Sequence, residues 1–148
     1  MKLPFLIGRL LFGGYFLYNG INHFKNRSQL AQYAASKGVP GPEVAVALTG
    51  AMLLVGGTSI IAGVKPKVGA AAVAGFLAGV SPIMHNFWKA EDRTQAMNDT
   101  INFTKNLALL GGTLALMSVT EPWPASLPVA QPRKLAGVKR ELQQRLAA

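Results

Sequence analysis

The 148-residue sequence contains no cysteine. Disulfides, thiol redox chemistry, thiolate-bound metal ions and iron–sulfur clusters are therefore excluded for this chain alone. Histidine is nearly as scarce, with two residues. Two imidazoles without a cysteine or a nearby glutamate leave a four-coordinate zinc site short of protein ligands, so we do not expect a metal site.

Charged residues are also few, at 14% of the chain, and 15 Lys and Arg outnumber six Asp and Glu. The net charge of +9 does not indicate nucleic-acid binding, because basic and aromatic residues are not interleaved on a soluble module. Many of the cations flank apolar stretches, which makes anionic lipid headgroups the more suitable partner. No nucleotide-binding loop, nucleophile elbow or dinucleotide fingerprint is present. We therefore do not expect the chain to be an enzyme by itself.

Four apolar stretches, residues 3–21, 44–64, 68–84 and 103–119, dominate the sequence. Each approaches the length of about 20 residues that a helix needs to cross a bilayer. Backbone groups in hydrocarbon must be paired within helices or closed barrels, and continuous apolar runs without period-two alternation favour helices. We therefore expect an all-α membrane protein, a four-transmembrane-helix bundle over residues 1–120.

The connections between these stretches differ in length. Residues 25–43 can hold a short amphipathic helix around 28–36 that ends at Gly38, whereas Lys65-Pro66-Lys67 allows only a tight hairpin. A weak repeat links Leu-Val-Gly-Gly-Thr at 54–58 with Leu-Leu-Gly-Gly-Thr at 109–113. This repeat suggests two related hairpins.

The C-terminal region changes in character after residue 120. Four prolines within 121–132 exclude a regular helix and predict an extended linker. Leucine and valine then recur at helical spacing among basic residues over 133–148, which predicts a basic amphipathic helix on an anionic cytoplasmic surface. A partly disordered tail that folds only on a partner is the alternative.

The distribution of Lys and Arg residues between the two sides predicts how the chain is oriented in the membrane. With four antiparallel spans, the side that holds both termini carries nine of the 15 Lys and Arg residues and the other side carries six. The positive-inside rule then places both termini in the cytoplasm. We expect an integral protein of the inner (plasma) membrane of a bacterium or archaeon.

No carboxylate is expected at the membrane midplane. All six acidic residues fall in expected loops, span ends or the tail: Glu43, Glu91, Asp92, Asp99, Glu121 and Glu141. A proton relay or coupled-ion site requires an ionisable group at that depth, so this absence counts against an ion-coupled transporter or pump. Arg9 lies about two turns into the first span, and we expect it to snorkel to the inner interface rather than to pair with another group.

A candidate binding site lies at the outer interface. The first and third spans both run outward, so their histidines fall at one level, which is also where the fourth span begins. The candidate cofactor-binding residues there are His23, His85, Asn106, Lys105, Asn22 and Asn86. Such a group can hydrogen-bond a quinone, exchange its protons or ligate a haem. A bis-histidine haem is less favoured, because the sequence does not show that the imidazoles face each other. Polar residues are also enriched at bilayer interfaces without any ligand, and this remains the alternative.

Two packing motifs accompany this site. Gly75 and Gly79 form G-x-x-x-G and, with Ala71 one turn earlier, predict a small-residue stripe for close helix contact. Pro82 is expected to kink the third span just before His85.

Several short motifs recur in a characteristic order along the chain. These motifs are Gly8-Arg9-Leu10-Leu11 with Gly20, Tyr33-Ala34-Ala35-Ser36-Lys37-Gly38-Val39-Pro40, Leu54-Val55-Gly56-Gly57, His85 with Phe87-Trp88, and Lys105-Asn106-Leu107-Ala108-Leu109-Leu110-Gly111-Gly112. Their order and spacing resemble the DoxX family of small four-helix membrane proteins over about residues 5–118. The chain departs from the family at residues 48–52, where many members carry a glutamate.

The resemblance implies association with membrane redox systems, including subunits linked to quinone reduction. We therefore expect a small accessory subunit of a quinone-linked oxidoreductase or electron-transfer complex, with quinone as the cofactor and larger membrane subunits and lipids as partners. Two alternatives stay open. One is a purely structural subunit that contacts lipid or pigment within a larger complex, and the other, less favoured, is a carrier of small molecules or lipids.

Overall fold

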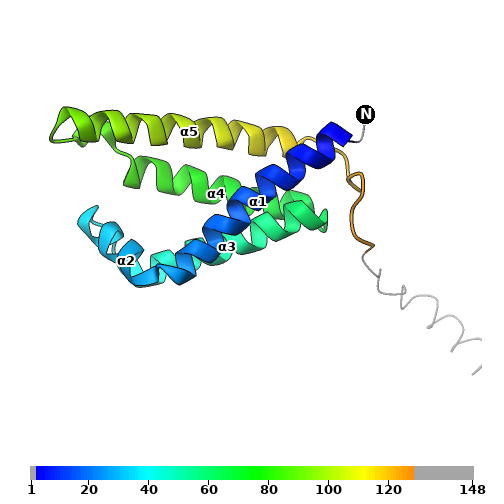
Figure 1. The fold of residues 1–148 in the computed structure, drawn as a ribbon, viewed down its shortest axis with the longest axis horizontal. Helices are drawn as coiled ribbons and strands as arrows, with labels where there is room; N and C mark the ends of the chain where they lie inside the picture. The colour runs from blue at the N-terminus through cyan, green and yellow to red at the C-terminus, as the bar shows by residue number, and fades with distance from the viewer. Residues whose placement is uncertain (1–2, 129–148) are drawn as a thin grey trace, which may run out of the picture.

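The computed structural model describes residues 3–128, which form helices and turns with no strand (Figure 1). The expected tail helix at 133–148 and the end of the expected linker lie outside the described residues. The elements are α1 (Leu3–Lys25), α2 (Arg27–Ser36), α3 (Pro42–Ala62), α4 (Pro66–Met84), the 3₁₀ turn η1 (Phe87–Lys89) and α5 (Arg93–Met117).

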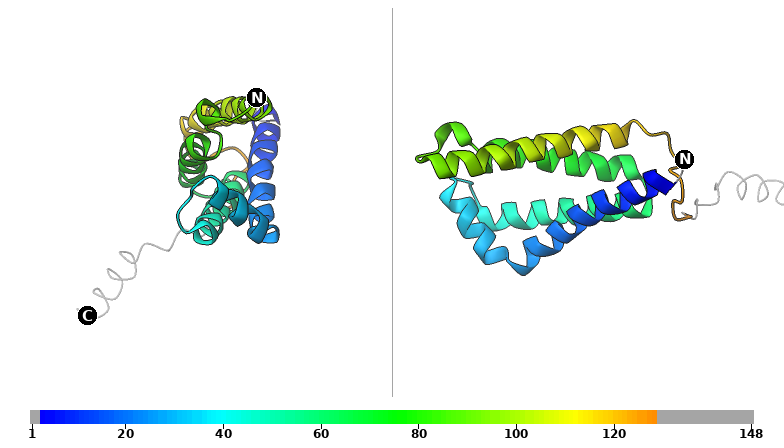
Figure 2. Two further views of the ribbon diagram at one scale, coloured as in Figure 1. Left: turned by 90° about the vertical axis from the view of Figure 1, so that its left-hand side faces the viewer. Right: turned by 45° about the horizontal axis from the view of Figure 1, so that its top comes forward.

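The four long helices form a bundle in which α1 packs on α3, α3 on α4, and α4 on α5 (Figure 2). The start of α1, the α3–α4 turn and residues 118–128 lie at one end, which we call the strap end. The short helix α2, η1 and the start of α5 lie at the other end, which we call the α2 end (Figure 1). The expected short helix and hairpin are confirmed as α2 and the α3–α4 pair.

Two helical segments are long and apolar enough to cross a membrane: α3, with a mean hydropathy of 2.0, and the stretch Pro66–Lys89, with 1.5. Helices α1 and α5 have 23 and 25 residues, which at 1.5 Å per residue also exceeds a hydrocarbon core of about 30 Å. Their mean hydropathy is lower because they carry more polar residues, several of them buried inside the bundle. Four spans therefore remain a prediction for α1 and α5.

Glycine allows the closest helix contacts. A Cβ atom at Gly57 of α3 would lie 2.6 Å from the Leu17 backbone nitrogen and 2.7 Å from the Gly13 carbonyl oxygen of α1. On the next face of α3, a Cβ at Gly56 would lie 3.0 Å from the Gly69 carbonyl oxygen of α4. Side chains at these positions would hold the backbones apart, so these contacts depend on glycine.

The expected helix contact through Gly75 and Gly79 is wrong. A Cβ at Gly75 would meet only the Met52 side chain, at 3.5 Å, and a Cβ at Gly79 would meet nothing within 4 Å. Ala71, the third member of the stripe, is exposed. The close contacts of α4 are made by Gly69 instead, and Gly75 and Gly79 are exposed and line an open cavity.

Residues 118–128, which we call the strap, contain no helix but fold back across the end of the bundle. Trp123 is buried in the core and packs edge-on against Phe5, with ring centroids 5.5 Å apart. The Leu127 backbone N–H donates to the Ala62 carbonyl oxygen over 2.9 Å. The described part of the expected extended linker therefore packs as part of the helical bundle.

Arg9 holds the strap in place. Its guanidinium donates to the carbonyl oxygens of Pro124 at 2.7 Å and Ala125 at 2.9 Å, and the residue is 2% exposed. The expected snorkelling of Arg9 is therefore wrong. The strap supplies acceptors inside the bundle, so the charge is paired with backbone dipoles instead of reaching the interface.

Candidate functional site

Three cavities lie toward the α2 end, and His85 lines all of them. This residue follows the last turn of α4, where its backbone N–H donates to the Ser81 carbonyl oxygen over 3.0 Å. The end of α4 therefore places a single imidazole at the junction of three spaces with different chemistry.

The first space, which we call the inner cavity, has a volume of about 180 Å³ and lies between α1, α4 and α5. Its polar lining residues are Tyr15, Asn19, His85, Lys105 and Asn106, and its apolar ones are Phe16, Phe76, Leu77 and Val80. The Asn106 residue is only 7% exposed, and its amide has no hydrogen-bond partner among residues 3–128. The amide reaches the cavity space, so it is available to a ligand or to water there.

The second space, which we call the apolar cavity, has a volume of about 390 Å³ and is bounded by α1, α2, α3 and α4. Gly75 and Gly79 leave room for it, because neither carries a side chain. It shares Phe76, Val80 and His85 with the inner cavity. An apolar chain in this space would therefore lie directly beside the polar groups of the inner cavity.

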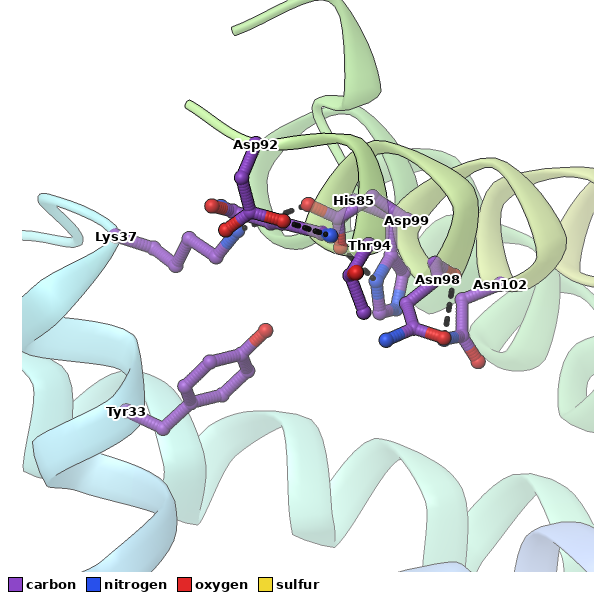
Figure 3. Close-up of a pocket in the computed structure, with 9 residues that line it drawn as sticks. Tyr33, Lys37, His85, Asp92, Thr94, Asn98, Asp99 and Asn102 are labelled. Atoms are coloured by element: carbon purple, nitrogen blue, oxygen red, sulfur yellow. Dashed lines mark hydrogen bonds and ion pairs between the residues drawn. The ribbon is translucent and has the colours of Figure 1, made fainter. Parts of the chain in front are cut away.

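The third space, which we call the outer polar cavity, measures about 420 Å³ and lies between the end of α2 and the start of α5 (Figure 3). Nine residues line it: Tyr33, Lys37, His85, Asp92, Thr94, Gln95, Asn98, Asp99 and Asn102. At this cavity the end of α2 lies close to the start of α5.

A charged cluster lines the outer polar cavity, and its His85 also lines the other two cavities. Lys37 Nζ lies 3.2 Å from Asp99 Oδ2, and His85 Nδ1 lies 3.4 Å from Asp99 Oδ1 (Figure 3). Asp99 is 4% exposed. Both of its oxygens thus face a potential donor, which compensates the burial of the carboxylate.

The profile of one protein family matches residues 5–86, more than half of the chain. The chain belongs to the DoxX family. This match covers α1 to α4 and includes His85, and it ends before Asp99 and Asn106 of α5. No curated protein and no solved structure matches the chain.

Within this DoxX membrane protein, the predicted site residues separate into two groups. His85, Lys105 and Asn106 line the inner cavity together, and His23 meets His85 across the apolar cavity. Asn22 and Asn86 line none of the three cavities. The Asn22 Oδ1 instead accepts a hydrogen bond from Asn26 Nδ2 over 2.6 Å, which ties two turns of the chain together.

The two histidines of the DoxX chain differ in their partners. His23 Nδ1 lies 2.8 Å from the Asn19 carbonyl oxygen, and its ring packs edge-on against Phe76 with centroids 6.0 Å apart. A carbonyl oxygen only accepts, so this Nδ1 carries the hydrogen. His85 faces a carboxylate instead. Within residues 3–128 no group of three or more His, Asp or Glu is placed to hold a metal ion.

Sequence reasoning missed Lys37 and Asp99. The sequence predicts no role for Lys37 beyond its charge and its place in a family motif. It places Asp99 in a loop or at a span end, whereas Asp99 lies in the second turn of α5. A signal for Asp99 was present, because the three buried residues of α5 are polar and recur every seven positions: Asp99, Asn106 and Thr113. A polar heptad in a membrane helix indicates a face directed into the bundle.

Proposed function

We propose that this DoxX protein is a small integral-membrane subunit that binds a quinone and supports a quinone-linked oxidoreductase or electron-transfer complex. The observation that supports it best is the unpartnered, 7% exposed Asn106 in a polar cavity that shares His85 with an apolar one. A polar head with an apolar tail is the class of ligand that such a pair of cavities fits.

The chain's own residues supply distinct contacts. Asn106 carries both an amide donor and a carbonyl acceptor, so it can bind either a carbonyl or a hydroxyl oxygen of the head group. Phe76 and Val80 form the shared apolar wall, along which the tail would run toward Gly75 and Gly79. Each buried methylene of the tail would contribute roughly 0.8 kcal/mol. Quinone chemistry also requires an electron donor or acceptor, so the proposal includes a partner subunit with a redox cofactor.

The distribution of apolar surface supports four spans. Each long helix exposes large apolar side chains outward, for example Leu11 in α1 (72%), Val55 in α3 (60%), Val68 in α4 (62%) and Leu107 in α5 (57%). Four polar residues of α1 and α5 are buried instead: Arg9, Asp99, Asn106 and Thr113. This arrangement suits hydrocarbon outside and polar function inside. Lipids and larger membrane subunits are the partners that such a surface fits.

Equilibrium binding tests the proposal. The full chain would be placed in nanodiscs of phosphatidylcholine and titrated with decylubiquinone, a short-tailed quinone. We expect saturable binding that weakens at least tenfold in Asn106→Leu, because a buried polar contact is lost. Asn22→Leu is the matched control, since Asn22 lines no cavity, and it should change the affinity less than twofold.

Several results would contradict the proposal. One is the absence of saturable binding, and another is an equal loss in Asn106→Leu and Asn22→Leu. Stable co-purification with larger subunits but without quinone would favour the purely structural role.

A further inference from the structure

The Asp99 carboxylate lies beside the His85 ring. The carboxylate oxygen Oδ1 faces His85 Nδ1, and Oδ2 is occupied by Lys37 Nζ. An ionised carboxylate only accepts hydrogen bonds, so the ring nitrogen that faces it carries the hydrogen. The other ring nitrogen, Nε2, points away from Asp99 and has no partner among the described residues.

The charges around the ring favour a neutral imidazole. Lys37 and Asp99 cancel each other, so a neutral His85 leaves the cluster uncharged. A protonated His85 would add an unbalanced positive charge in a half-buried position, on the same cavity as Lys105. Asp92 also lines the outer polar cavity, but its carboxylate caps α5 by accepting the Gln95 backbone N–H over 2.8 Å. Tyr15 and Tyr33, which share cavities with the ring, carry no negative charge. Burial of an unpaired charge is unfavourable.

We propose that Asp99 is a positioning residue that holds His85 as the Nδ1–H tautomer, so that Nε2 accepts a hydrogen bond from a ligand hydroxyl and the site prefers the quinol over the quinone. This inference rests on the proposed function. A neutral imidazole has one N–H, and Asp99 uses it, which leaves only a lone pair for the ligand. A quinol hydroxyl can donate a hydrogen bond to that lone pair. A quinone carbonyl oxygen only accepts, so its lone pairs would face the lone pair of Nε2. Asn106 does not discriminate, because its amide both donates and accepts.

The tautomer can be measured directly. The chain has two histidines, so ¹⁵N-histidine NMR of the full chain in nanodiscs gives two ring patterns, which a His23→Gln variant assigns. We expect the wild-type His85 pattern to show a protonated Nδ1 and an unprotonated Nε2. Asp99→Asn should populate the Nε2–H form, and Asp99→Glu should restore the wild-type pattern. A wild-type His85 with hydrogen on Nε2 would overturn the inference, whatever the Asp99 variants show.

The ligand preference has its own readout. Decylubiquinol and decylubiquinone would be titrated separately into wild-type protein, the quinol under anaerobic conditions. We expect the quinol to bind at least tenfold more tightly, equivalent to a rise of about 30 mV in the midpoint potential of the bound two-electron couple. In Asp99→Asn the ratio should fall below about threefold.

The outcomes separate the two proposals. Equal binding of both forms, or tighter binding of the quinone, overturns the preference but leaves the proposed function standing. Binding of neither form overturns the proposed function and the preference together. A merely structural role for Asp99 would lower both affinities by the same factor and leave their ratio at the wild-type value, which also contradicts the inference.

Discussion

At the scale of single residues, Arg9 shows how a charge is accommodated inside the bundle. Two charge-assisted bonds to the strap contribute roughly 3–6 kcal/mol together, whereas the Nε–H, which has no partner, costs about 1–3 kcal/mol. The bonds therefore outweigh the unpaired donor. Arg9 stabilises the strap, and the strap in turn buries Trp123.

Arg9→Met should release the strap. We expect the free energy of unfolding to fall by about 2 kcal/mol, because the strap loses its two charge-assisted hydrogen bonds to Arg9. In a Trp88→Phe background only Trp123 fluoresces, since the chain has two tryptophans, and its emission should become accessible to a water-soluble quencher. The control is Arg27→Met, which removes an exposed ion pair to Glu43 and should cost less than about 1 kcal/mol. Equal quenching in both variants would contradict the role of Arg9.

Sequence patterns predicted the helices well and the contacts between distant residues poorly. Apolar runs, Gly38 and the Lys65-Pro66-Lys67 turn located four long helices and one short one. Arg9 bonds to carbonyls 115 and 116 positions away, and Lys37 pairs with Asp99 at a separation of 62. The acceptors of Arg9 are backbone carbonyl oxygens, which every residue carries, so the side-chain pattern does not identify them. The Lys37–Asp99 pair joins the ends of two helices, and it depends on how the helices pack in three dimensions.

At the scale of elements, α4 carries a feature that its sequence disguises. The G-x-x-x-G pattern commonly allows two helices to approach, yet here both glycines face a cavity. The missing side chains leave open volume instead of a helix contact, and the proposed ligand tail would lie there. A larger side chain at a packing glycine would push two helices apart. A larger side chain at Gly75 or Gly79 would fill the cavity instead.

Gly79→Leu should weaken quinone binding without loss of fold. A leucine would fill part of the apolar cavity and exclude about two methylenes of a decyl tail, which at roughly 0.8 kcal/mol each corresponds to a loss of about tenfold or slightly more. Titration with a tail-free ubiquinone head group should show less than a threefold change. Gly111→Leu is the control, because that position is also open but lies on α5 outside the cavities. Unfolding of Gly79→Leu, with Gly111→Leu intact, would instead indicate a helix contact at Gly79.

At the scale of the whole molecule, the two ends of the bundle are predicted to face opposite sides of the membrane. The Lys67 backbone N–H donates to Glu121 Oε1 over 3.2 Å, so the α3–α4 turn and the strap lie at one end. The outer polar cavity and the charged cluster lie at the other end. The excess of Lys and Arg on the strap side predicts that this end faces the cytoplasm.

Single cysteines in this cysteine-free chain should report that orientation. We expect Lys67→Cys and Thr120→Cys to react with an impermeant maleimide only from the cytoplasmic side, and Lys89→Cys and Arg93→Cys only from the opposite side. All four positions are exposed. Labelling of Arg93→Cys and Thr120→Cys from the same side would show that α5 does not cross, and would leave the bundle with fewer spans.

The most direct test of quinone binding at His85 and Asn106 is the quinone content of protein purified in mild detergent from its native membrane, measured by mass spectrometry with the partner subunits identified in the same sample. Wild-type protein should retain close to one quinone per chain, and the double variant His85→Phe/Asn106→Leu should retain less than a tenth of that amount while keeping its partners. Equal quinone in both preparations, or none in the wild type, would contradict a quinone site in these cavities.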